Sequence, residues 1–161
     1  PILGPTTQGT FLGPELLSCL VEHLFPLITV ATPNRKEATI LSGIPSYNTA
    51  PIAQWAEHLP CSVLVTGGDG PEDGIEDILY RKGLAPCRWT GPKIGAMSIH
   101  GTGCALSSCI AANLALGSHI EKASMGGILY VRKLAQNALT VQGAAQRILT
   151  PGMTLDPRDT D

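Results

Sequence analysis

Residues 62–68 read Ser-Val-Leu-Val-Thr-Gly-Gly, an apolar and β-branched run that ends in two glycines. Its apolar residues do not alternate with polar ones, which is typical of a strand buried on both faces of a sheet. Residues 27–32, Leu-Ile-Thr-Val-Ala-Thr, form a similar run between Pro26 and Pro33. Both runs therefore predict short buried strands, which occur mostly in parallel sheets covered by helices.

Segments with helical periodicity surround these strands. Apolar residues recur every three to four positions in residues 14–25, where Pro14 suits the first helical turn. Helices are expected at residues 14–25, 34–41, 51–59, 104–116 and 118–139. Gly43 would end the second helix, and Ser118 with Glu121 forms a capping-box pattern that would open the last one. Strands that alternate with helices predict an α/β domain with a mostly parallel sheet.

Residues 75–80 and 86–90 predict a β-hairpin around Arg81-Lys82-Gly83. The glycine-rich residues 67–74 before it predict a loop. The expected loop carries three Asp carboxylates, those of Asp69, Asp73 and Asp77. Their spacing does not fit a calcium-binding EF-hand loop, so we expect a solvated acidic loop.

The composition excludes several classes of function. The 161 residues carry 11 Lys and Arg and 13 Asp and Glu, a formal net charge of −2, whereas a nucleic-acid binder needs a dense basic face. No apolar run approaches the ~20 residues of a membrane span, and no signal-peptide pattern is seen. The five cysteines are odd in number and form no Cys-x-x-Cys pair, which argues against a disulfide framework or a structural zinc site. Reduced thiols predict a cytoplasmic protein. The charge balance and the lack of a long apolar run predict that it binds neither nucleic acid nor membrane.

The strongest chemical signal is residues 100–104, His-Gly-Thr-Gly-Cys, directly before an expected helix. Glycines at a helix start let the backbone turn unpaired N–H groups toward a ligand, and with the helix dipole these groups bind anions. Cys104 would lie in the first turn, where a thiolate is stabilised and could orient or deprotonate a substrate hydroxyl. A tight turn that leads to a buried structural cysteine explains the same residues, and both interpretations stay open at this point.

Two further motifs lie just past expected strands, where ligands gather in open parallel sheets. One is the glycine pair at residues 67–68. The other is residues 32–37, Thr-Pro-Asn-Arg-Lys-Glu, in which Asn34 and Glu37 share one helix face. The same two residues fit a helix N-cap with a capping-box Glu, which explains them without any ligand.

In combination, these motifs resemble a known family, the thiamine-pathway hydroxymethylpyrimidine/phosphomethylpyrimidine kinases of the ribokinase superfamily. The C-terminal half of that family has the same three motifs in the same order, here Thr32-Pro33-Asn34-x-x-Glu37-Ala38, Val63-Leu64-Val65-Thr66-Gly67-Gly68 and His100-Gly101-Thr102-Gly103-Cys104. The resemblance covers residues 1–149 and leaves residues 150–161 as a flexible tail. It implies a three-layer ribokinase-like domain with a mostly parallel sheet, of which residues 1–149 would be the C-terminal, nucleotide-binding part.

Residues 1–3, Pro-Ile-Leu, resemble the end of a strand in that family. The resemblance therefore implies that the first strands of the sheet and most of the pyrimidine pocket belong to a longer chain. On its own, residues 1–161 are expected to lack kinase activity and to aggregate or exchange strands with a second copy, because an apolar sheet edge would be uncovered.

The resemblance also implies roles for individual residues. Asn34 and Glu37 would place Mg²⁺, mainly through its water shell. The nucleotide side would be lined by Thr66, Gly67 and Gly68. The anion hole would be formed by Gly101, Thr102, Gly103 and Cys104. Cys104 would also be the catalytic residue, at the position where most of the superfamily has an Asp as general base, and a Cys there is typical of the pyrimidine kinases.

The implied activity is the transfer of a phosphoryl group from ATP, with Mg²⁺, to hydroxymethylpyrimidine or its phosphate in thiamine biosynthesis. The substrate is a small molecule, and members of the family often form homodimers. Two other functions fit the motifs: a pyridoxal kinase of the same superfamily, and a non-catalytic relative that binds a nucleotide or a pyrimidine. A structural α/β fragment without ligands is a further reading.

This chain departs from the family pattern beside the glycine pair. The family commonly has Lys before the two glycines and His after them, whereas this chain has Thr66 and Asp69. A cation near the nucleotide phosphates would then be missing. Either ATP binding is weaker, or Arg35 or Lys36 supplies the charge.

Overall fold

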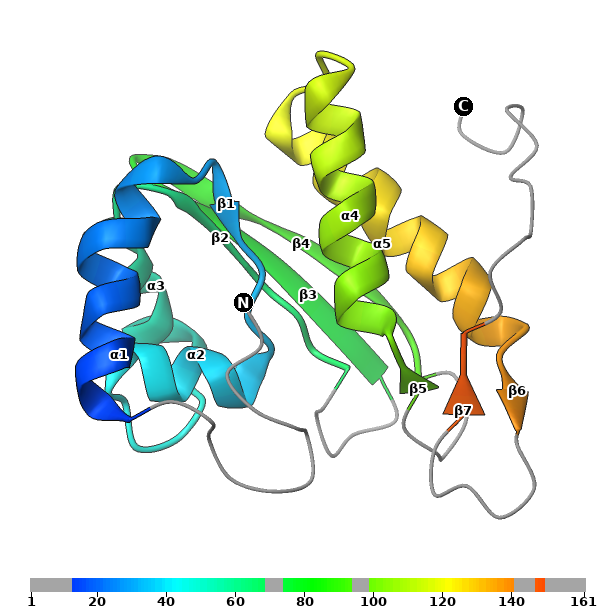
Figure 1. Cartoon of the computed structure of the whole chain (residues 1–161), viewed down its shortest axis with the longest axis horizontal. Coiled ribbons are helices and arrows are strands. Elements are labelled where there is room, and N and C mark those ends of the chain that lie inside the picture. Colours follow the sequence, from blue (N-terminus) through cyan, green and yellow to red (C-terminus); the bar gives the residue numbers. More distant parts are fainter. Residues whose placement is uncertain (1–12, 69–73, 94–98, 141–146, 150–161) are drawn as a thin grey trace. The chain divides into compact units, whose positions relative to one another are not determined.

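The computed structural model describes residues 13–68, 74–93, 99–140 and 147–149, which are coloured in Figure 1. The chain divides into two compact units, residues 1–91 and residues 92–161. Each unit has helices and a sheet of its own. The expected tail at residues 150–161 lies outside the described residues, as do Asp69 and Asp73.

The first unit is built on a four-stranded sheet. Its strand order is β1 (Val30–Ala31), β2 (Ser62–Val65), β3 (Gly74–Arg81) and β4 (Leu84–Pro92). β1 and β2 are parallel, with Ala31 opposite Val63, whereas β2 and β3 are antiparallel, with Val63 opposite Tyr80. The α/β class is confirmed, but the sheet is mixed and not mostly parallel, because the expected hairpin adds β3 to β2 in the opposite direction.

The helices of the first unit are α1 (Pro14–Cys19), α2 (Arg35–Ser42) and α3 (Thr49–Glu57). The single helix expected at residues 14–25 is broken up: α1 continues as a π-helical turn, η1 (Leu20–Leu24), and a 3-10 turn, η2 (Phe25–Leu27). Pro26 lacks an N–H donor, so α-helical hydrogen bonds cannot continue through it. Because η2 occupies residues 25–27, β1 has only two residues and is shorter than expected.

The core of the first unit lies between α2, α3 and one face of the sheet (Figure 1). Val63 and Val65 of β2 and Ile78 of β3 pack there with Ile52 of α3. Leu64 of β2 points to the opposite face and is also fully buried. The apolar run of β2 is therefore buried on both faces, as predicted.

The second unit contains β5 (Ile99–His100), α4 (Thr102–Ala115), α5 (Ile120–Gln136), β6 (Leu139–Thr140) and β7 (Arg147–Ile148). In its small sheet, β7 lies between the other two strands, parallel to β5 and antiparallel to β6. α4 and α5 pack against each other at Gly127. A Cβ there would lie 2.8 Å from Cγ1 of Ile110 and 3.0 Å from Cδ1 of Leu106, so the two helices approach this closely because residue 127 has no side chain.

The capping box expected to begin at Ser118 is wrong, because α5 begins one residue later, with His119 as its N-cap. Ser118 instead completes the end of α4. Its N–H donates to the carbonyl of Asn113 at 3.0 Å, and the N–H of Gly117 donates to the carbonyl of Leu114 at 3.0 Å. These two bonds form a Schellman motif at the end of α4. Ser118 belongs to this motif and is therefore not the N-cap of α5.

Candidate functional site

The carboxyl ends of β1 and β2 bring two of the expected motifs together. These strands are parallel neighbours, so the residues that follow them lie at the same edge of the sheet. The pairing continues past the strands as an isolated parallel bridge between Asn34 and Thr66, and the N–H of Thr66 donates to the carbonyl of Pro33 at 2.9 Å. The residues just past the two strands therefore lie side by side.

Asn34 and Glu37 form the capping box of α2. The N–H of Glu37 donates to Oδ1 of Asn34 at 2.8 Å, and the N–H of Asn34 donates to Oε2 of Glu37 at 3.0 Å. The capping interpretation is confirmed, and it is compatible with ligand binding. The two bonds hold both side chains in one conformation at the sheet edge, and they leave Oε1 of Glu37 without a hydrogen-bond partner among the residues described.

This edge fits a hydrated magnesium ion. Mg²⁺ prefers oxygen ligands, keeps several of its waters and takes few direct contacts from a protein. Glu37 offers one carboxylate oxygen and Asn34 one amide, both half-buried at the start of α2. Across the four described ranges, no three His, Cys, Asp or Glu side chains gather in a way that could hold a metal ion. An ion at this edge would take its other ligands from water and phosphate oxygens.

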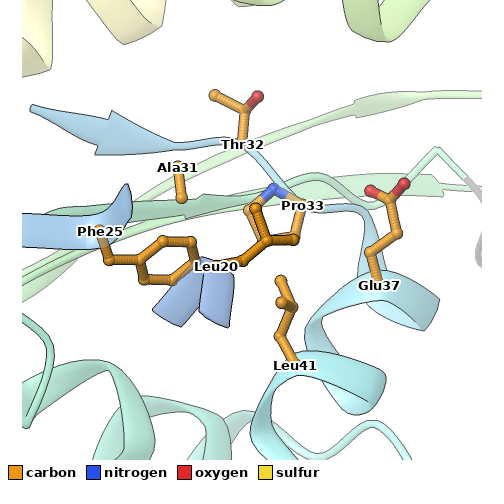
Figure 2. Close-up of a pocket in the computed structure, with 7 residues that line it drawn as sticks. All are labelled: Leu20, Phe25, Ala31, Thr32, Pro33, Glu37 and Leu41. Carbon is orange, nitrogen blue, oxygen red and sulfur yellow. The ribbon is translucent and has the colours of Figure 1, made fainter. Parts of the chain in front are cut away.

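A small pocket lies beside this edge, and Figure 2 shows the residues that line it, namely Leu20, Phe25, Ala31, Thr32, Pro33, Glu37 and Leu41. Its volume of about 30 Å³ has room for a water molecule, whereas small-molecule sites measure about 300–1,000 Å³. The carboxylate of Glu37 points away from Leu41 in this view (Figure 2). The pocket is therefore too small for a nucleotide or a pyrimidine.

The two glycines after β2 differ in their surroundings. Gly67 is buried against β3, where a Cβ would collide with the carbonyl oxygen of Glu76 and lie 2.9 Å from its backbone nitrogen. Gly68 is exposed, and no atom lies within 4 Å of the position of its missing Cβ. The N–H of Gly67 donates to Oδ1 of Asp77 at 3.0 Å, and the N–H of Thr66 donates to the carbonyl of Pro33, just past β1. Both N–H groups are thus used inside the protein, and a ligand at this edge would meet the backbone of Gly68.

The expectation that Asp77 belongs to a solvated acidic loop is wrong. Asp77 lies inside β3 and is only 5% exposed. The signal that could have separated it from Asp69 and Asp73 is its place within residues 75–80, Ile-Glu-Asp-Ile-Leu-Tyr, which predict a strand. A carboxylate inside a buried strand needs a hydrogen-bond partner, and the N–H of Gly67 is one.

The start of α4 has the geometry that the glycine motif predicts. Gly101 is the N-cap with a φ of +93°, a conformation that favours glycine, and the N–H of Ala105 makes the first helical bond to its carbonyl at 3.0 Å. Among the described residues, no side chain caps this helix start. The first-turn N–H groups, which belong to residues 102–104, therefore have no side-chain acceptor there. Thr102 donates its hydroxyl backward to the carbonyl of Ile99 at 3.4 Å. This arrangement can bind an anion.

Cys104 is the third residue of α4 and is exposed. The alternative of a buried structural cysteine at this position is therefore wrong. Cys109, in the same helix, is half-buried and accepts a 3.5 Å hydrogen bond from Nδ2 of Asn113. Burial raises the pKa of the Cys109 thiol, with the Asn113 hydrogen bond acting against it. Of these two cysteines, Cys104 is the more exposed.

The two candidate replacement cations lie in the first turn of α2. The guanidinium carbon of Arg35 lies 5.0 Å from the centre of the Tyr47 ring, a cation–π contact. Burial raises the pKa of Tyr47, while the nearby charge of Arg35 lowers it. Lys36 is exposed beside it. Both charges are close in sequence to Asn34 and Glu37, at the edge where phosphates would bind.

The predicted site residues thus fall into two groups. The first unit brings together Asn34, Glu37, Thr66, Gly67 and Gly68. The second unit holds Gly101, Thr102, Gly103 and Cys104 at one helix start.

Solved structures define the class of protein. The fold is that of the ribokinase-like kinases. The ADP complex of a pyridoxal kinase from Bacillus subtilis matches with a TM-score of 0.73 and 28% sequence identity, over 82% of this chain and 53% of that chain.

Sequence comparisons then define the family. A family model described as phosphomethylpyrimidine kinase matches residues 1–148, and the chain belongs to this family. The thiamine biosynthetic bifunctional enzyme TH1 of Arabidopsis thaliana is 34% identical over 144 residues, which cover 86% of this chain and 27% of that protein. The hydroxymethylpyrimidine/phosphomethylpyrimidine kinase of Synechococcus elongatus is 31% identical over 145 residues, which cover 88% of this chain and 55% of that protein. The resemblance seen in the motifs is confirmed, and the chain spans about half the length, or less, of these relatives.

Proposed function

We propose that the protein is a small-molecule kinase that transfers the γ-phosphoryl group of ATP to hydroxymethylpyrimidine, or to its phosphate, in thiamine biosynthesis. The observation that carries this proposal is the start of α4, an uncapped helix start that presents the exposed thiol of Cys104. The name of the Synechococcus relative supports the substrate class. ADP in the complex of the Bacillus pyridoxal kinase supports ATP as the phosphoryl donor.

In this proposal, the N–H groups of residues 102–104 bind the oxygens of the transferring phosphoryl group at the positive end of the α4 dipole. Cys104, as a thiolate, orients the substrate hydroxyl and accepts its proton while the hydroxyl oxygen forms a bond to the γ-phosphorus. The bond between that phosphorus and the ADP oxygen breaks, and ADP leaves. Asn34 and Glu37 would hold Mg²⁺ through its waters, and the ion would neutralise phosphate charge when bound. The backbone of Gly68 borders the nucleotide.

We assign residues 1–149 to the C-terminal, nucleotide-binding part of a ribokinase-like kinase domain. We propose a cytoplasmic location, which the five cysteines support, because all five lie among the described residues and no two are joined in a disulfide. Within the residues that the structure describes, no helix has the length and apolar character to cross a membrane. A net charge of −2 supports a small-molecule substrate over a nucleic acid. We assign a homodimer as the working assembly of the whole protein.

The test is a turnover assay of the full-length protein with ATP, Mg²⁺ and hydroxymethylpyrimidine, in which released ADP is measured. Cys104→Ala should lower kcat by about 10²–10⁴-fold, the usual contribution of a positioned acid–base group, with little change in the Kd for ADP. Cys109→Ala is the matched control in the same helix and should keep kcat within about twofold. Near-normal turnover of Cys104→Ala would show that the thiol is structural and that the mechanism is wrong.

Pyridoxal kinase activity is the second candidate, and the similarity to the Bacillus pyridoxal kinase favours it. The same assay with pyridoxal in place of hydroxymethylpyrimidine decides between them by the ratio of the two kcat/KM values. A protein that binds ADP but turns over neither substrate would be the non-catalytic relative that Thr66, in place of the family's Lys, allows.

A further inference from the structure

Asp77 reaches the candidate nucleotide edge from a different strand. In the β2–β3 ladder, Val65 lies opposite Ile78, so the next position along places Thr66 opposite Asp77. The backbone pairing between these two strands ends there. Beyond it, Oδ1 of Asp77 accepts the N–H of Gly67 at 3.0 Å. A carboxylate therefore fixes the first residue of the loop that follows β2.

Steric contact fixes the same residue from a second direction. The backbone of Gly67 is pressed against β3 so closely that a Cβ would collide with the backbone of Glu76. The hydrogen bond to Asp77 and this contact together set the position of Gly67, and with it the start of Gly68, which is exposed and has open space beside it.

Asp77 does not itself face a ligand, since it is 5% exposed. A buried carboxylate bonded to a backbone N–H is a strong, directional constraint, because water does not replace this hydrogen bond when it breaks inside the protein. Its effect on a ligand must pass through the backbone that it holds. Asp77 is in this sense a positioning residue.

We infer that Asp77 positions the Gly67–Gly68 backbone for the nucleotide and thereby sets nucleotide affinity. This inference rests on the proposed kinase function. Loss of the Asp77 acceptor lets Gly67 move, which weakens nucleotide binding and raises the KM for ATP. The start of α4, where phosphoryl transfer is proposed, is untouched, so kcat changes little.

The experiment measures ADP binding to the full-length protein by calorimetry, together with KM for ATP and kcat. Asp77→Ala should raise both the Kd for ADP and the KM for ATP about tenfold or more, with kcat within about threefold. Asp77→Asn keeps an oxygen at the position of Oδ1 and should restore the Kd to within about threefold of the wild-type value. Glu76→Gln is the matched control on the same strand, because Glu76 pairs with Arg88 at the surface, and its Kd should not change.

A merely structural role for Asp77 would lower the melting temperature and the binding stoichiometry but leave the Kd of the folded fraction unchanged, and this result would overturn the inference. Where Asp77→Ala does not fold, Asp77→Glu replaces it, because the longer side chain keeps the charge but displaces Gly67. An unchanged Kd in that variant also overturns the inference. Wild-type protein that binds no ADP would overturn the proposed function as well. Wild-type protein that binds ADP without turnover would refute only the proposed activity, since the Kd comparison still stands.

Discussion

Replacement of Glu37 separates the two roles given to its carboxylate, the cap of α2 and the placement of Mg²⁺. Glu37→Gln keeps an oxygen that can accept the N–H of Asn34, now bonded at 3.0 Å, but it loses the negative charge in the first turn of the helix. The lost charge–dipole interaction should lower the free energy of unfolding by about 0.3–1 kcal/mol. Glu37→Ala also removes the acceptor, which costs about 1 kcal/mol more.

The requirement for Mg²⁺ should respond differently. Both variants lack the carboxylate, so both should raise the Mg²⁺ concentration for half-maximal activity by a similar factor, about 10–100-fold, as is typical when a group that supports a metal is removed. Stability thus distinguishes Gln from Ala, whereas the Mg²⁺ titration does not. Urea denaturation measures the first quantity, and the ADP-release assay of the full-length protein at varied Mg²⁺ measures the second.

Glu57→Gln is the matched control. Oε1 of Glu57 also accepts a backbone N–H, that of Gly83 at 2.8 Å, but Glu57 lies at the end of α3 in the hairpin contact and not at the proposed phosphate edge. Its Mg²⁺ titration should match that of the wild-type protein. If Glu37→Gln also leaves the Mg²⁺ titration unchanged, the carboxylate serves only as a helix cap and the magnesium assignment is wrong.

Two further predictions concern stability. In α5, Gly127→Ala should lower the free energy of unfolding by about 1 kcal/mol in urea, because about 2 kcal/mol of overpacking against Ile110 exceeds the roughly 1 kcal/mol gained in helix propensity. Gly126→Ala, whose Cβ would be 3.8 Å from its nearest neighbour, should raise the free energy of unfolding by about 1 kcal/mol. If Gly127→Ala is instead the more stable of the two variants, the close helix contact at Gly127 is contradicted. Burial raises the pKa of the Cys61 thiol, so between the unfolded and folded pKa values the folded protein keeps a proton that the unfolded chain releases. Stability should therefore fall as the pH rises above about 8.5, and Cys61→Ala should make this fall shallower.

Features that depend on neighbouring residues could be predicted from the sequence. Val63, Leu64 and Val65 of β2 are consecutive apolar residues, and such a run needs burial on both faces of the sheet whatever packs against it. Asn34 and Glu37 are three residues apart, so their capping box forms within one helical turn. Gly43 ends α2 in the left-handed conformation that the position requires, with a φ of +70°.

Features that depend on distant residues could not be predicted. The partner of Asp77 is ten residues away on another strand, and only the β2–β3 register shows that its carboxylate meets Gly67. Ser118 and Glu121 have the spacing of a capping box for α5, but the N–H of Ser118 is bonded to the end of α4. The connection between the two helices is short, so the end of one helix and the start of the next compete for the same residue. The family resemblance places Thr66 and Gly67 on the nucleotide side, and only the structure shows that their N–H groups donate to the carbonyl of Pro33 and to the carboxylate of Asp77.

Gly67 and Gly68 are neighbouring glycines that should tolerate substitution differently, because only Gly67 lies close against β3. At a glycine with a positive φ, such as Gly43, asparagine is a tolerable substitute, because the cost there is one of backbone torsion. Gly67 does not have a positive φ. Substitution there is prevented by the backbone of Glu76, with which the Cβ of any other residue would collide. Every single-base change that alters its codon's meaning therefore either adds a Cβ or stops translation. In a saturation library, position 67 should retain glycine alone, while position 68 should accept small residues.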